Sequence, residues 1–162
     1  MFKKFVSSLI VMLLVVGCSS NKVEETPKEE EVAEFNIADV TKKLCEDLGL
    51  YESLSEFPSN RMNAMLFQND EEALSEGALY LSSDKKADTI GLFKTDNKDK
   101  CIEYINTYIE SLKDRANNYT PEETFKIDKA IVETNEDGSL VAFVICDDIE
   151  LAKEKVNEIL GK

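Results

Sequence analysis

Apolar residues recur every three or four positions in four stretches of the chain, which is the spacing of one face of an α-helix. These stretches predict helices over residues 37–48, 60–67, 97–118 and 149–160. Gly49 follows the first stretch, at the position where a left-handed residue commonly ends a helix. The helix over 97–118 carries one apolar stripe that must pack on a sheet, formed by Ile102, Ile105, Ile109, Leu112 and Ala116.

Shorter apolar runs between polar turns predict four strands, over residues 77–82, 89–95, 130–134 and 139–146. The last two strands flank Asn135-Glu136-Asp137-Gly138, which is a hairpin signal. The predicted elements are therefore two leading helices, then two strands, a helix, two strands and a final helix. This order predicts an α+β fold: a mainly antiparallel four-stranded sheet of two hairpins with helices packed on one face.

The first residues have a different pattern, with Lys3 and Lys4 before an apolar run over residues 5–16. The run is shorter than the roughly 20 apolar residues of a membrane-spanning helix and has the form of a secretory signal. Val15-Val16-Gly17-Cys18 follows, and it resembles the lipobox of bacterial lipoproteins, in which the cysteine thiol receives a diacylglycerol and cleavage leaves that cysteine first. A signal peptide with an incidental cysteine would need a small-x-small cleavage site, which Val15 does not supply.

We therefore expect residues 1–17 to be a lipoprotein signal peptide and Cys18 to carry lipid, palmitate included, on the extracytoplasmic face of the cell membrane. Residues 18–35 are rich in glutamate and poor in apolar side chains. Such a segment cannot bury enough surface to fold, so it predicts an acidic flexible tether. An acidic recognition tail is the alternative. Residues 36–162 then form a single domain.

The charge and composition exclude several classes of partner and of catalytic chemistry. A net charge of −14 argues against nucleic acid and anionic membrane surfaces as partners, and makes a cationic electrostatic partner more plausible. The chain contains no histidine and only 6 glycines, scattered singly. Histidine-based proton transfer, Ser-His or Cys-His nucleophiles and glycine-rich phosphate loops are therefore excluded. No cofactor is expected, and a carboxylate-based hydrolase is the one enzymatic alternative left.

Three cysteines remain once Cys18 is lipidated: Cys45, Cys101 and Cys146. Their number is odd and none forms a C-x-x-C pair, so at least one is unpaired. Cys101 and Cys146 stand among apolar residues and are expected to act as small buried hydrophobic side chains. A disulfide between two of the three is the alternative, whereas a zinc site lacks the four clustered ligands that it needs.

Two short motifs invite a chemical interpretation. Ser82-Ser83-Asp84-Lys85 fits S-x-x-K, but the companion lysine-threonine-glycine strand is missing, since the nearest run is Lys94-Thr95-Asp96. A solvated hairpin turn is expected there. Glu133-x-Asn135-x-Asp137-Gly138 resembles the opening of a calcium loop, but the twelfth position is Val144 instead of glutamate. Here too a hairpin turn is the simpler interpretation.

The acidic run Asp147-Asp148-Ile149-Glu150 follows an apolar strand, where catalytic or metal-binding carboxylates are often found. Asp147 and Glu150 are also spaced as a capping box at a helix start. The cap is the expected role, with a cation site and an acid-base pair as alternatives.

Two binding functions stay open. The domain is either a non-enzymatic interaction module for a protein or cell-wall partner, or a lipid-anchored protein that binds a small solute or cation. A solute pocket between helices and sheet has four candidate lining residues, although tyrosines there are more often half-buried core: Tyr80, Tyr104, Tyr108 and Tyr119. A closed apolar pocket would favour the solute, and a contiguous exposed apolar patch would favour the macromolecular partner.

Five segments carry a resemblance to a known family: Asp39–Leu44, Gly49–Leu54, Tyr80–Ser83, Ile90–Lys94 and Tyr119–Glu123. With them the chain resembles small lipoproteins of Gram-positive bacteria that are known as domain of unknown function 4358. The resemblance covers nearly the whole folded part. It implies a secreted, lipid-anchored module with no established activity, and it supplies no functional residues.

Overall fold

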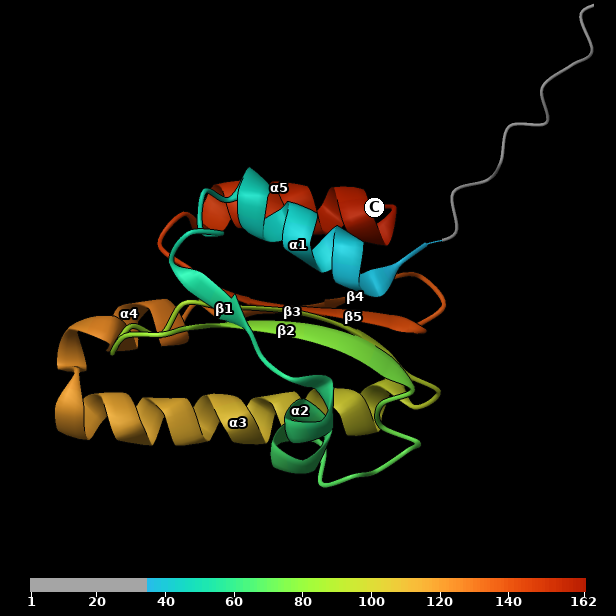
Figure 1. The fold of residues 1–162 in the computed structure, drawn as a ribbon, viewed down its shortest axis with the longest axis horizontal. Helices are drawn as coiled ribbons and strands as arrows, with labels where there is room; N and C mark the ends of the chain where they lie inside the picture. Colours follow the sequence, from blue (N-terminus) through green and yellow to red (C-terminus); the bar gives the residue numbers. More distant parts are fainter. Residues whose placement is uncertain (1–34) are drawn as a thin grey trace, which may run out of the picture. The chain divides into compact units, whose positions relative to one another are not determined.

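The computed structural model describes residues 35–162, which form an α+β domain (Figure 1). The expected signal peptide over 1–17, the lipidated Cys18 and the tether up to residue 34 lie outside the described residues. In chain order the elements are α1 (Ile37–Asp47), β1 (Leu54–Glu56), α2 (Ser59–Leu66), β2 (Glu76–Ser82), β3 (Thr89–Lys94), α3 (Lys98–Tyr119), η1 (Pro121–Glu123), α4 (Thr124–Ile127), β4 (Ile131–Thr134), β5 (Leu140–Ile145) and α5 (Ile149–Leu160).

The sheet has five strands in the order β1-β2-β3-β5-β4, and every neighbouring pair is antiparallel. The two predicted hairpins, β2–β3 and β4–β5, are confirmed. The prediction of four strands was wrong because β1 has only three residues, too few to show an alternating pattern. β1 lies at one edge, where Leu54 is the partner of Ser82 on β2.

Helices cover both faces of the sheet, so the prediction that they pack on one face was also wrong. Helices α1 and α5 lie side by side on one face, and α2 and α3 lie on the other (Figure 1). All six residues of β5 are buried, because neighbouring side chains point to opposite faces and both faces are covered. Phe143 belongs to the core under α2 and α3, and Val144 to the core under α1 and α5.

The Phe93 ring occupies space that two glycines leave open on the face of the sheet. A Cβ atom at Gly91 would lie 2.5 Å from Cζ of Phe93, and a Cβ atom at Gly77 would lie 2.8 Å from its Cδ1. Gly77 is the cross-strand partner of Phe93, and Gly91 precedes it by two residues on the same face. These contacts place the fully buried Phe93 edge-on against Phe67, at a ring-centroid distance of 5.1 Å.

The ends of the outer helices follow ordinary capping chemistry. Asn36 caps α1, and Gly49 adopts φ +67° after it, as the sequence predicts. Helix α5 begins where expected, but its N-cap is Asp148, whose Oδ1 accepts a hydrogen bond from the Leu151 N–H at 3.1 Å. The capping box of Asp147 and Glu150 was therefore wrong: Asp147 points instead toward Lys126, 3.5 Å away.

Both cores and every strand pairing lie within residues 35–162, and Glu34–Lys162 forms one compact unit. Residues 35–162 thus have two hydrophobic cores and a five-stranded sheet of their own. Of the helices in this part of the chain, none is both long enough and apolar enough to cross a membrane.

Candidate functional site

A buried lysine binds three carboxylates at the end of the sheet where the β2–β3 loop, α4 and the end of β5 meet. Nζ of Lys126 lies 3.1 Å from Asp88, 2.9 Å from Glu123 and 3.5 Å from Asp147. The Lys126 side chain is only 3% exposed, although it lies on a helix of four residues. A buried ammonium group is stable only when it is paired in this way, so these contacts hold the three segments together.

The charges of this cluster shift one another. Burial on its own would lower the pKa of Lys126, but hydrogen bonds to Glu123 and Asp88 outweigh burial and raise it to about 12. Burial also raises the pKa of Asp88, and Lys126 opposes this rise. The pKa of Glu123 is lowered, because the Ala87 N–H and Lys126 together outweigh burial. Lys126 is therefore a fixed cation whose charge is neutralised inside the domain, not a group free to bind a ligand.

A groove with a volume of about 560 Å³ lies beside this cluster. We call it the α2–α3 groove, because Met65 on α2 and the second half of α3 form two of its walls and the β2–β3 loop forms a third. The wall from α3 consists of residues spaced four, three and four apart, which places them on one face of the helix: Tyr108, Leu112, Arg115 and Tyr119.

The groove has an apolar lining that reaches the surface. Phe57, Leu81 and Leu112 line it, together with Met65 and Tyr119. Met65 is 48% exposed and Tyr119 is 80% exposed, so two of the large exposed hydrophobic side chains of the domain meet at this groove. Because large exposed apolar side chains that gather in one place often mark a binding surface, this lining points to contact with a ligand or partner.

Cations surround the same groove. Lys85, Lys86 and Arg115 line it, and Arg61 stacks on the Phe57 ring at 5.1 Å. None of these four forms an ion pair within residues 35–162.

The two carboxylates that line the groove already have partners. Asp84 accepts hydrogen bonds from the Ser82 hydroxyl and the Lys86 N–H, which lower its pKa, and Asp88 binds Lys126. These neutral donors keep Asp84 ionised, so the lining side chains without an ion pair among the described residues are three cations, Lys85, Lys86 and Arg115, and one carboxylate, Asp84.

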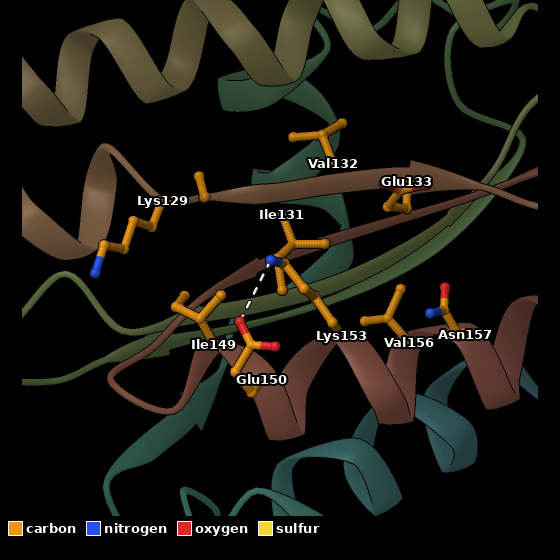
Figure 2. Close-up of a pocket in the computed structure, with 10 residues that line it drawn as sticks. Lys129, Ile131, Val132, Glu133, Ile149, Glu150, Lys153, Val156 and Asn157 are labelled. Atoms are coloured by element: carbon orange, nitrogen blue, oxygen red, sulfur yellow. Dashed lines mark ion pairs between the residues drawn. The ribbon is translucent and has the colours of Figure 1, made fainter.

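A second groove, of about 590 Å³, lies between the edge strand β4 and helix α5 (Figure 2). Its charged side chains are mostly neutralised, since Lys153 lies 3.5 Å from Glu150 and Glu133 lies 2.6 Å from Lys162. Two of its apolar residues, Ile131 and Val156, are buried between strand and helix, as Figure 2 shows, and the other three, Ala130, Val132 and Ile149, are half-buried. This groove matches the first in size but offers a ligand little apolar surface and few free charges.

The four tyrosines that the sequence offered as pocket residues do not gather at one site. Tyr108 and Tyr119 line the α2–α3 groove, and Tyr104 lies nearby, where its hydroxyl donates to Asp70 at 3.3 Å. Tyr80 is buried on the opposite face of the sheet, under α1. The prediction of one pocket lined by all four tyrosines is therefore wrong, because Tyr80 and helix α3, which carries the other three, lie on opposite faces of the sheet.

The two short motifs form hairpin turns, as expected. The Ser82 hydroxyl hydrogen-bonds to Asp84, and Lys85 lines the groove. In the β4–β5 turn Asp137 accepts from the Ser139 N–H at 2.8 Å, and Asn135 accepts from the Leu140 N–H at 2.9 Å. Asn135 and Asp137 of the calcium-like sequence therefore bind the backbone of their own turn, and Glu133 binds Lys162.

The three cysteines of the domain are buried and free, which confirms the interpretation of Cys101 and Cys146 as small buried hydrophobic side chains. Burial raises the pKa of Cys101 to about 12 and that of Cys146 to about 11, so both thiols are protonated at neutral pH. No group of three or more metal-binding side chains suited to a metal ion occurs in residues 35–162.

The sequence analysis missed Lys126 and the cations of the groove. One signal for the short helix was present: Thr120-Pro121-Glu122-Glu123 combines a T-x-x-E spacing with proline at the first helical position. Nothing in the spacing of Arg61, Lys85 and Arg115 indicated a shared site, because a separate element carries each of them.

Comparison with known proteins identifies a family to which the chain is similar. Searches of curated proteins and of solved structures find no match. The family model of a domain of unknown function, DUF4358, matches residues 46–146, which include every residue that lines the α2–α3 groove. Since this match spans more than half of the 162 residues, the chain belongs to the DUF4358 family.

Proposed function

We propose that this chain is a lipid-anchored protein of the bacterial cell envelope, and that its domain is a non-enzymatic binding module that acts through the α2–α3 groove. The observation that carries the binding role is the combination of exposed apolar side chains and unpaired cations at one groove. Ligand sites commonly join an apolar lining to a few polar groups that fix orientation.

The anchoring part rests on the sequence before the domain. The basic start, the apolar run over residues 5–16 and the lipobox-like Val15–Cys18 together support export and lipidation. The acidic segment after Cys18 would then hold the domain away from an anionic bilayer, because like charges repel.

The groove supports binding better than catalysis. Lys126, the most buried charged group next to it, is fully paired. The carboxylates of the cluster bind Lys126 and the Ala87 N–H, so they are committed to internal contacts and not positioned as a free acid and base. The lining otherwise consists mainly of apolar and cationic side chains, which can bind a ligand without transferring a proton.

Anchoring is tested by comparing the native chain with Cys18→Ala in the cells that produce it. The proposal predicts that the native chain is found in the membrane fraction and carries fatty acid on Cys18 by mass spectrometry. Cys18→Ala should lose the acyl groups and leave the membrane fraction. Equal membrane association of both chains without acyl modification would refute the anchor.

Binding through the groove is tested by photo-crosslinking in intact cells. A photoreactive side chain at Met65 lies at the groove, whereas one at Glu154 lies on exposed α5. The proposal predicts a specific adduct from Met65 and none from Glu154, and a weaker adduct when Tyr119→Ala is added. Adducts of equal yield from both positions, or from neither, would overturn the role of the groove.

A further inference from the structure

Most of the free charges at the α2–α3 groove differ in sign from the charge of the protein as a whole. The chain carries a net charge of −14, yet three cations that form no ion pair within residues 35–162 line this groove: Lys85, Lys86 and Arg115. Arg61 lies over the ring of the lining residue Phe57. The lysines that form ion pairs in the described residues lie outside the groove lining. Because these cations outnumber the single free carboxylate of the lining, Asp84, the groove is suited to bind an anion.

The positions of these cations indicate where the anionic group would lie. Lys85 and Lys86 come from the β2–β3 loop, and Arg115 comes from the facing wall on α3. An arginine guanidinium can bind a phosphate or carboxylate through two parallel hydrogen bonds, and lysine adds a positive charge. Burial raises the pKa of Tyr108, and the nearby positive charge of Arg115 partly opposes this rise.

The rest of the groove requires an apolar part in the same ligand. Phe57, Met65, Leu81 and Leu112 give the lining an apolar part beside the cations, and a volume of about 560 Å³ is within the usual range for small-molecule sites. A small inorganic anion would leave these side chains exposed. A purely apolar molecule would leave the cations without a partner.

The negative charge of the protein as a whole favours a small anionic ligand over a large one. Charges more than a Debye length away, roughly 8 Å at physiological salt, are largely screened, so a small anion at the groove responds mainly to the nearby cations. A long polyanion would extend beyond the groove and meet the acidic remainder of the domain. The charge distribution therefore favours a ligand with one compact anionic group over an anionic polymer.

We propose that the α2–α3 groove binds an anionic amphiphile, in which a phosphate or carboxylate contacts Arg115, Lys85 and Lys86 and an apolar chain or ring lies against Phe57, Met65 and Leu81. This inference rests on the proposed function and adds the chemical class of the ligand. Two sources share the chemistry, namely a free acidic amphiphile and the headgroup and first methylenes of an anionic lipid.

The test is a calorimetric titration of residues 35–162 with three probes: octyl phosphate, octyl glucoside and inorganic phosphate. The two octyl compounds are used below their critical micelle concentrations. The expected result is saturable 1:1 binding of octyl phosphate, with each of the other two at least about tenfold weaker, since each lacks one half of the recognised structure. Equal binding of octyl glucoside, or no binding of octyl phosphate, would overturn the inference.

Matched variants locate the binding. Arg115→Gln should weaken octyl phosphate by about tenfold or more, whereas Lys129→Gln, which removes an equal charge at the β4–α5 groove, should leave it unchanged. Leu81→Asn, which adds no charge, should weaken the binding of octyl phosphate by removing apolar surface from the groove. Circular dichroism checks that each variant is folded, and an equal loss with Lys129→Gln would contradict the assignment.

Flotation with vesicles distinguishes the two sources. Binding to vesicles that contain phosphatidic acid, lost with Arg115→Gln, identifies the lipid headgroup, and its absence alongside octyl phosphate binding identifies a free amphiphile. The crosslinking experiment at Met65 separates this inference from the proposed function. A specific adduct with a protein, combined with no binding of octyl phosphate, refutes the ligand class and leaves the binding module intact.

Discussion

The Lys126 ammonium lies 3.1 Å from the Asp88 carboxylate, and both side chains are buried although they are 38 positions apart in the sequence. This pair ties helix α4 to the β2–β3 loop, which also supplies Lys85 and Lys86 to the α2–α3 groove. The shape of the groove therefore depends on an ion pair that takes no direct part in binding.

Replacing Lys126 with methionine should destabilise the domain by about 3–5 kcal/mol, because it leaves buried carboxylates without their cation. Urea unfolding followed by circular dichroism measures this change. The exposed pair of Lys43 and Asp47 provides a control, since Lys43→Met should cost less than about 1 kcal/mol. The double variant Lys126→Met with Asp88→Leu should recover part of the loss, and equal losses in the single and double variants would contradict the pairing.

Gly91→Ala should lower the free energy of unfolding by about 1–3 kcal/mol, since the new methyl group would lie 2.5 Å from the Phe93 ring. Thermal and urea unfolding both report this loss. Adding Phe93→Leu should make the alanine less damaging than it is in the native background. An alanine that costs the same with either residue at position 93 would show that the close contact with the ring is not the cause.

Asp148→Ala should lower stability by about 0.5–2 kcal/mol, because Asp148 caps α5 through the Leu151 N–H. Asp147→Ala should have a smaller effect, since the Asp147 side chain is 73% exposed and lies 3.5 Å from Lys126. Parallel urea titrations of the two variants provide the comparison. A larger loss for Asp147→Ala would contradict the observed cap.

The stability of the domain should fall as pH rises above about 9. Burial raises the pKa of Cys101 from 9.0 to about 12, so above pH 9 the unfolded chain releases a proton that the folded domain still holds. Each such thiol lowers the free energy of unfolding by up to about 1.4 kcal/mol per pH unit until the pH reaches its folded pKa. Cys101→Ala should flatten the pH dependence under reducing conditions. An unchanged slope between pH 9 and 11 would contradict the protonated, buried thiol.

Most elements of the fold could be predicted from periodicity, because β2, β3, α3 and α5 carry long apolar patterns. Which faces of the sheet the helices cover could not be predicted so directly. The uninterrupted apolar run over residues 140–145 is typical of a strand covered on both sides, whereas the hairpins favour a sheet with one open face, so the two patterns point to different arrangements. β1 was missed because three residues carry no pattern.

The candidate site depends on contacts that no local pattern reveals. Arg61 is on α2, Lys85 is in a loop and Arg115 is on α3, so only the tertiary structure brings them to one groove. The net charge of −14 suggested a cationic partner, because a sum over the chain cannot show that most of the free charges at one groove have the opposite sign. The sequence likewise gives no signal that Lys126 is buried, because its carboxylate partner Asp88 lies 38 positions away.

The central claim is that the α2–α3 groove is the binding surface of this domain, and an amide NMR titration of residues 35–162 with octyl phosphate tests it most directly. The account predicts saturable shifts for the amides of Leu81, Lys86 and Arg115, and unchanged signals for Val132 and Lys153 at the β4–α5 groove. Shifts centred on Val132 and Lys153, or no saturable shift at any amide, would contradict it.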